Sequence, residues 1–150
     1  MTDSRQAAAT PAHLGWRLIA AVYDLLPLLA LWFFATVLAL ALTGGALDVH
    51  RLGDKLLVQA LVLLASAAYF ALSWSRGGQT IGMKPWRLRV VRGDGTSPDL
   101  AHALLRFAVA LVSLTALGIG FWWALFDTQR RTWHDIAAGT VMVRMEKSRD

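Results

Sequence analysis

Three long stretches without a formal charge constrain this chain more than any other feature of its sequence. They cover residues 25–47, 56–75 and 107–126, which are 23, 20 and 20 residues long. A helix that crosses a bilayer needs about 20 apolar residues, at a rise of about 1.5 Å each. Hydrophobic residues make up 56% of the chain and charged residues 17%, and the mean hydropathy is +0.47. The sequence therefore excludes an ordinary water-soluble globule and predicts an all-α membrane protein.

We expect three transmembrane segments, at about residues 14–42, 56–75 and 101–126. The first is longer than a straight crossing requires, so a tilt, or a kink at Pro27, is expected. Gly118-Ile119-Gly120 interrupts the third, which favours a broken or re-entrant segment. Outside these segments we expect a flexible N-terminal tail over residues 1–12 and a C-terminal tail over residues 145–150.

The first apolar stretch has an alternative interpretation as a cleaved signal peptide, because Ala39-Leu40-Ala41 resembles a cleavage site. The apolar core of a signal peptide is only about 7 to 15 residues long. The stretch here is longer, and Arg17 and Asp24 precede it where a signal peptide would be basic and then apolar. We therefore expect a retained membrane helix.

Two short segments are predicted to be strands, at residues 86–92 and 140–145. In the first, Trp86, Leu88 and Val90 alternate with Arg87 and Arg89, which is the period of a half-buried strand. The second holds a β-branched run after a glycine. Together they predict a small cytoplasmic β element beside the membrane helices.

The distribution of Lys and Arg favours a bent third segment. Cations collect on the cytoplasmic side of a membrane protein. Three simple spans would place eight cations on one side of the membrane and seven on the other, which favours neither orientation. A third segment that returns gives thirteen against two, leaving only Arg51 and Lys55 on the opposite side. This arrangement predicts a cytoplasmic N-terminus and strand-like segments that meet on one side.

The same cations suggest the partners of the chain. Its net charge of +5 would indicate nucleic acid in a soluble protein. Here the basic residues flank apolar segments, so we expect a lipid bilayer with anionic headgroups and no nucleic acid. His102 and Arg106, four residues apart on a helix that enters the membrane, are expected to contact such headgroups.

Arg17 and Asp24 are the first candidates for a polar site. They are seven residues apart, so both project from one face of a helix, with a rise of about 10 Å between them. A carboxylate in a membrane helix costs about 2.5–3.5 kcal/mol on insertion scales and therefore needs a partner or water. We expect Arg17 to shelter Asp24. An ion pair of Arg17 and Asp24 with a purely structural role is an equally good interpretation of these two residues.

Asp135 is the third candidate. The sequence Thr132-Trp133-His134-Asp135 has the spacing of a capping box, so a solvated helix cap is as good an interpretation as a site. The four histidines show no ligand spacing and cysteine is absent, so neither metal nor cofactor is expected. The glycine-rich segment 77–82 is followed by Met83 and lacks the tripeptide of a phosphate loop. Because no catalytic constellation is readable, we do not expect an enzyme.

The assembled motifs resemble the RDD family of small, mostly bacterial membrane proteins, named for one arginine and two aspartates. The resemblance covers residues 14–144, within an expected membrane domain of residues 13–144. It rests on the following stretches: Gly15-Trp16-Arg17-Leu18, Tyr23-Asp24, Gly77-Gly78-Gln79-Thr80-Ile81-Gly82, Leu88-Arg89-Val90-Val91, Gly93-Asp94-Gly95, and Phe126-Asp127 through His134-Asp135 to Val141. The resemblance implies that the three naming residues are Arg17, Asp24 and Asp135. The residues expected to support them are Arg106, Asp127, His134, Gln79 and Thr80.

The resemblance implies little about activity. A cation/proton antiport has been attributed to one family member, so we expect a polar site for cation or proton exchange, in a multi-pass protein of the bacterial inner membrane. One carboxylate per chain is a sparse pathway, which favours a homo-oligomer. The alternative is a membrane scaffold or assembly partner that transports nothing, in which the three residues lock the helices together.

Overall fold

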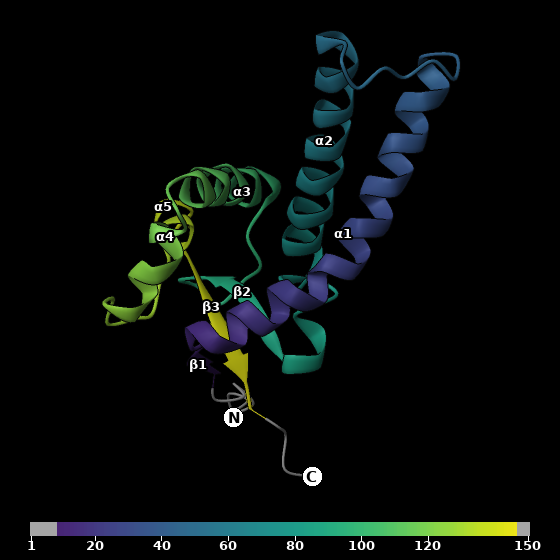
Figure 1. The fold of residues 1–150 in the computed structure, drawn as a ribbon. Coiled ribbons are helices and arrows are strands. Elements are labelled where there is room, and N and C mark those ends of the chain that lie inside the picture. The colour runs from purple at the N-terminus through teal and green to yellow at the C-terminus, as the bar shows by residue number, and fades with distance from the viewer. Residues whose placement is uncertain (1–8, 147–150) are drawn as a thin grey trace.

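Two long helices dominate the computed structural model, which describes residues 9–146 (Figure 1). Helix α1 spans Leu14–Leu42 and α2 spans Leu52–Gly77, and they lie side by side, joined by a short loop. Both are long and apolar enough to cross a membrane. The predicted first span has the observed bounds, and α1 runs through Pro27 as one helix. The second span is longer at both ends than predicted.

The third apolar stretch is broken, as the sequence predicts. Helix α3 covers Leu100–Thr115, and α4 (Ile119–Trp122) and the 3-10 turn η2 (Trp123–Leu125) follow it after a bend of 110°. Leu117 and Gly118 both have positive φ, at 55° and 75°. The left-handed backbone of these two residues ends α3 and turns the chain. The structure therefore has two candidate spans, or three if the bent pair counts as one.

A small antiparallel sheet lies at one end of the molecule, with strand order β1-β3-β2. Its strands are β1 (Ala9–Pro11), β2 (Leu88–Arg92) and β3 (Thr140–Met145). Val91 lies opposite Val141, so the two segments predicted as strands do meet. The first of them begins at Leu88, two residues later than predicted, because Lys84–Trp86 form a 3-10 turn, η1.

The expectation of a flexible tail over residues 1–12 is wrong for its last four residues. Residues 9–11 pair with β3, and Thr10 lies opposite Arg144. The backbone N–H of Ala12 donates to the carbonyl of Met142 at 2.9 Å, and Ala12 is buried. A short Ala-Thr-Pro segment carries no strand signal of its own, and β3 supplies the pairing. The rest of the predicted N-terminal tail, and residues 147–150 of the predicted C-terminal tail, lie outside the described residues.

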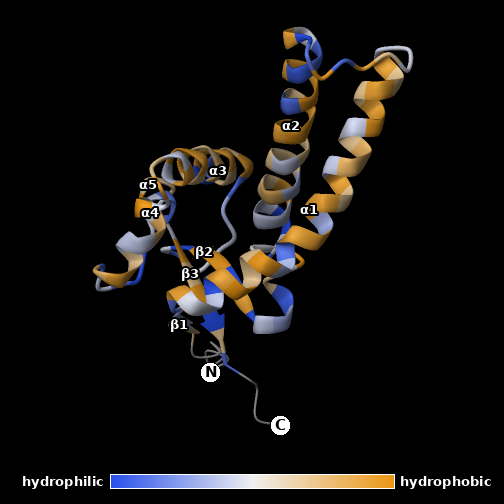
Figure 2. Cartoon of the chain, in the orientation of Figure 1, coloured by the Kyte–Doolittle hydropathy of each residue, from blue (hydrophilic) through white to orange (hydrophobic). Residues whose placement is uncertain are grey.

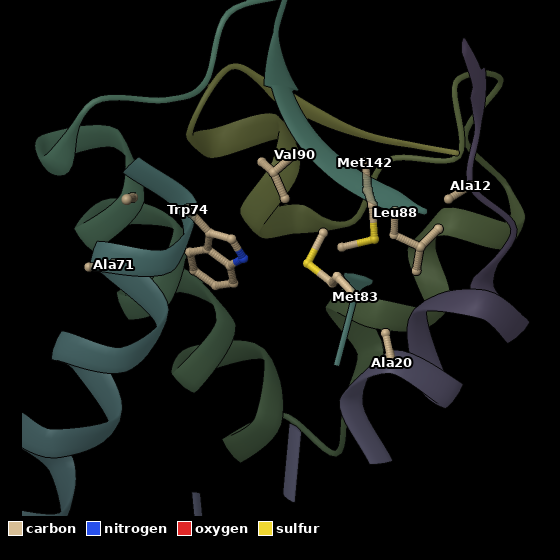
Figure 3. Packing of buried hydrophobic residues seen from close by; sticks show 9 residues of the cluster. Ala12, Ala20, Ala71, Trp74, Met83, Leu88, Val90 and Met142 are labelled. Carbon is tan, nitrogen blue, oxygen red and sulfur yellow. The ribbon is translucent and has the colours of Figure 1, made fainter. Parts of the chain in front are cut away.

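The hydrophobic core joins the sheet to the near ends of α1 and α2. Figure 3 shows Trp74 of α2 pointing toward Met83, Leu88 and Val90, with Met142 of β3 beside them. The far halves of α1 and α2 carry exposed apolar side chains instead (Figure 2). Such a surface suits contact with lipid rather than water.

One face of α1 is buried along its whole length. Its buried residues recur three, four or seven positions apart and are Leu14, Arg17, Ala20, Asp24, Leu28, Ala35 and Ala39. This spacing is that of a single helical stripe. It confirms that Arg17 and Asp24 share a face, and it turns both toward the rest of the protein.

Candidate functional site: two separate buried aspartates

The first polar cluster is centred on Asp135 in the short helix α5, Trp133–Ala137. One carboxylate oxygen of Asp135 accepts from Nη1 of Arg17, on α1, and the other accepts from Nη1 of Arg106, on α3. Asp135 and Arg106 have no solvent-exposed side-chain surface, and Arg17 is nearly as buried. Three elements that are distant in the sequence therefore meet at one carboxylate.

Further hydrogen bonds extend this Arg–Asp–Arg cluster, which we define as Arg17, Asp135 and Arg106. Nη2 of Arg17 donates to the carbonyl of Arg130 at 2.8 Å, and Nη1 of Arg106 donates to Oγ1 of Thr140 at 2.8 Å. The cluster thus ties α1 and α3 to the loop before α5 and to the start of β3. Removing one member would leave buried charge without its partner, which is strongly destabilising.

The capping box predicted at Thr132 is present. The backbone N–H of Thr132 donates to Oδ2 of Asp135 at 3.0 Å, and the backbone N–H of Asp135 donates in return to the side chain of Thr132. The cap is fully buried, however, so the interpretation of Asp135 as a solvated cap is wrong. Burial opposes ionisation, yet the guanidinium groups of Arg106 and Arg17 hold the pKa of Asp135 well below its usual range. Asp135 is thus the carboxylate that the two arginines and the helix cap share.

Asp24 belongs to a second, separate site between α1 and α2. Its carboxylate accepts from Oη of Tyr69 at 2.6 Å, from Oγ1 of Thr80 at 2.6 Å and from the backbone N–H of Gly82 at 2.8 Å. The side chain is buried. Among residues 9–146 no Lys, Arg or His forms an ion pair with Asp24. The carboxylate is thus held by neutral donors alone.

Gly82 is what allows the backbone to approach Asp24 so closely. A Cβ atom at this position would lie 2.2 Å from the carbonyl oxygen of Ala20 and 2.8 Å from the backbone nitrogen of Asp24. Both neighbours are helix backbone, which cannot move aside at low cost. Only glycine therefore lets the N–H of residue 82 reach the carboxylate.

The expectation that Arg17 shelters Asp24 is wrong. Side chains on a helix tilt toward its N-terminus, so Arg17 reaches back toward Ala12 and α5, away from Asp24. The expectation that Arg106 contacts lipid headgroups is also wrong, because its side chain is completely buried in the Arg–Asp–Arg cluster. Arg17 does pair with a carboxylate, but that carboxylate is Asp135.

The other expected supporting residues are divided among several places. Thr80 binds Asp24, whereas Gln79 donates to the carbonyl of Leu88 at 2.7 Å. His134 is buried beside Asp135, with Nε2 2.8 Å from Oγ1 of Thr132. Asp127 lies outside both sites and binds Arg131, at 3.1 Å between Oδ2 and Nε.

Sequence reasoning missed Tyr69. Its signal was a phenol in the middle of an apolar helix, where a buried hydroxyl requires a hydrogen-bonding partner. The hydroxyl oxygen also accepts from the backbone N–H of Ile81, at 3.2 Å. Tyr69 thereby fixes the segment that carries Thr80 and Gly82 against α1.

A cavity of about 860 Å³ lies between α1, α2 and the α3–α4 pair. Its walls are mostly apolar, and Asp24, Arg17 and Arg106 contribute to its lining. Within the described residues, no group of three or more His, Asp or Glu side chains is placed to hold a metal ion.

The long apolar helices and the buried Arg and Asp side chains place the chain in the class of small polytopic membrane proteins. The chain belongs to the RDD family, whose sequence model matches residues 11–139. This range contains Arg17, Asp24 and Asp135. No curated protein and no solved structure matches the chain.

Proposed function

We propose that Asp24 binds and releases a proton or a monovalent cation, and that the protein exchanges the two across the bacterial inner membrane. The observation that supports this most is the set of partners around Asp24, which is buried yet held by neutral donors. A carboxylate within a membrane helix is a functional candidate by default. The Arg–Asp–Arg cluster holds the fold around it.

The hydrogen-bonding partners of Asp24 are compatible with two alternating states of its carboxyl group, one ionised and one in which it holds a proton or a cation. The hydroxyl groups of Tyr69 and Thr80 can donate to a carboxylate, and they can also rotate to accept from a carboxylic acid or to bind a cation through oxygen. Oxygen ligands are those that hard cations prefer. A fixed Arg partner would instead have opposed protonation of Asp24.

The cavity beside Asp24 supports access to the site. Farther from the sheet it is lined by Gln59 and Ser66, two polar side chains of α2, and Ser66 accepts from Nε1 of Trp32 at 2.8 Å. One carboxylate per chain provides few binding positions for an ion that crosses the membrane, so we propose that exchange requires a homo-oligomer. The excess of cations at the sheet end favours a cytoplasmic location for that end.

A scaffold that transports nothing is the second candidate, and the Arg–Asp–Arg cluster favours it. That cluster joins α1, α3, α5 and β3, which is the role of a structural lock. In this case the basic residues around the sheet would contact anionic headgroups or a partner protein. Neither candidate makes the protein an enzyme.

Flux in reconstituted vesicles separates the two candidates. The purified protein is placed in vesicles with a pH-sensitive dye inside, and a Na⁺ or K⁺ gradient is imposed. Exchange predicts a pH change that Asp24→Asn abolishes while the variant stays folded, and Asp127→Asn, a control outside both sites, leaves it intact. An unchanged flux in Asp24→Asn would refute the proposal. A parent protein without flux would favour the scaffold.

A further inference from the structure

A second hollow, of about 350 Å³, lies at the sheet end of α2 and shares no lining residue with the apolar cavity. It is formed by the last turns of α2 and the segment after them, and two cations line it, Arg76 and Lys84. Both side chains are exposed, and neither forms an ion pair within residues 9–146. No Asp or Glu of the described chain lines the hollow. It therefore presents accessible positive charge that no neighbouring carboxylate balances.

The hollow lies at the end of a candidate membrane span. Helix α2 is one of the two such spans, and Arg76 is in its last turn. Leu72, one turn earlier on the same face of α2, is 40% exposed, and Ile81, in the segment after α2, is 56% exposed. We call these two side chains the apolar rim of the hollow. A ligand in the hollow would meet the two cations and, beside them, the apolar surface that a bilayer covers.

The ligand that fits both features is an anion with an apolar part. A guanidinium group binds phosphate through two parallel hydrogen bonds, and the ammonium group of a lysine binds it as a point charge. Ser73, which also lines the hollow, adds a hydroxyl group that can donate. The C-terminal end of α2 carries partial negative charge, which opposes an anion. This effect of an exposed helix end is weaker than two charge-assisted hydrogen bonds.

We propose that the hollow binds the headgroup of one anionic membrane phospholipid, with its phosphate between Arg76 and Lys84 and an acyl chain along the apolar rim. Charge complementarity selects an anion, and the apolar rim at the end of a span selects a lipid over a soluble phosphate. Both cations are on the surface, so the headgroup reaches them without any change in the fold.

A lipid bound in this way would join α2 to the segment that builds the Asp24 site. Lys84 follows directly on the residues 80–82, and Thr80 and Gly82 donate to the carboxylate of Asp24. The lipid would therefore hold this segment in place from its far end. The inference does not depend on exchange at Asp24, and Asp24→Asn is expected to keep the lipid. A failure of exchange and a failure of lipid binding can thus be distinguished.

Native mass spectrometry of the full chain tests the proposal. The protein is released from detergent micelles that contain equal amounts of phosphatidylglycerol and phosphatidylcholine with the same acyl chains. We expect one phosphatidylglycerol per chain, retained about tenfold over phosphatidylcholine, the difference that one charged contact contributes. Equal retention of the two lipids would overturn the proposal. Release of the phosphatidylglycerol by excess inorganic phosphate would assign the hollow to a soluble anion and would overturn it as well.

Variants that remove one charge separate a single binding site from a general attraction of the basic end for anionic lipid. Arg76→Gln and Lys84→Gln each remove a cation of the hollow, and the control Arg87→Gln removes an exposed cation that does not line it. Circular dichroism verifies that each variant is folded. We expect each hollow variant to retain about tenfold less phosphatidylglycerol and the control to retain as much as the parent. Equal losses in all three variants, or full retention in both hollow variants, would contradict the proposal.

Discussion

Arg17 and Asp135 lie 118 positions apart in the chain and form a direct, buried ion pair. Arg106 completes the contact from the other carboxylate oxygen. Two of the three residues that the sequence singled out as candidates therefore form one structural unit. The third, Asp24, has different partners and lies in a separate site among neutral donors.

Neutralising Asp135 is expected to destabilise the protein severely. Asp135→Asn leaves the guanidinium groups of Arg17 and Arg106 buried without a counter-charge, and such a loss costs about 3–5 kcal/mol of unfolding free energy. Unfolding in detergent measures it. The control is Asp127→Asn, which removes an ion pair with Arg131 near the surface and should have a much smaller effect. Equal effects of the two substitutions would argue against the structural role of Asp135.

Adding one methyl group at Gly82 is expected to separate the segment 79–83 from α1. In Gly82→Ala the new carbon would collide with the backbone of Ala20 and Asp24, at a cost of about 1–3 kcal/mol or more. Gly77→Ala is the matched control, because a Cβ at Gly77 meets nothing within 4 Å. Thermal unfolding of both variants should show a loss for Gly82→Ala alone. A Gly82→Ala protein as stable as the parent would disprove the close approach.

Removing the Tyr69 hydroxyl tests the hydrogen bond that sequence reasoning missed. Tyr69→Phe deletes a donor to the buried Asp24 carboxylate, and a hydrogen bond to a charged group contributes about 1.5–3 kcal/mol. In the double variant with Asp24→Asn the two losses should be less than additive, because both remove one contact. Strictly additive losses would show that the two side chains do not interact.

Stability is expected to fall as the pH drops below about 6.5, because of His134. Burial, and after it the charge of Arg106, lowers the pKa of His134 from 6.5 to about 3 in the folded protein. The unfolded chain therefore takes up a proton first, and folding loses about 1.4 kcal/mol per pH unit between these values. His134→Gln should remove this slope between pH 6.5 and 5, measured by thermal unfolding in detergent. A parent protein whose stability is constant over that range would contradict the assignment.

The sequence was sufficient for elements that depend on local pattern. The first apolar segment predicted a helix with the bounds of α1, and Gly118 predicted the broken third segment. The charge count favoured a chain that returns, which brings β2 and β3 together. The spacing of Arg17 and Asp24 predicted their shared face.

The contacts across that face could not be predicted, because they depend on residues far away in the chain. Arg17 and Asp24 are near in sequence, which suggested a pair, whereas the true partners come from α5 and from the segment after α2. Arg106 looked like a residue at a membrane boundary until the bend after α3 placed α5 beside it. The edge strand β1 has no signal of its own and forms only because β3 offers a free edge.

A pair of double-mutant cycles tests the central claim, which is that Arg17 forms its ion pair with Asp135 and not with Asp24. One cycle combines Arg17→Gln with Asp135→Asn, and the other combines Arg17→Gln with Asp24→Asn, each followed by unfolding in detergent. We expect a coupling energy of about 1–3 kcal/mol for Arg17 with Asp135, and additivity within about 0.5 kcal/mol for Arg17 with Asp24. Strong coupling between Arg17 and Asp24, with none between Arg17 and Asp135, would contradict the account.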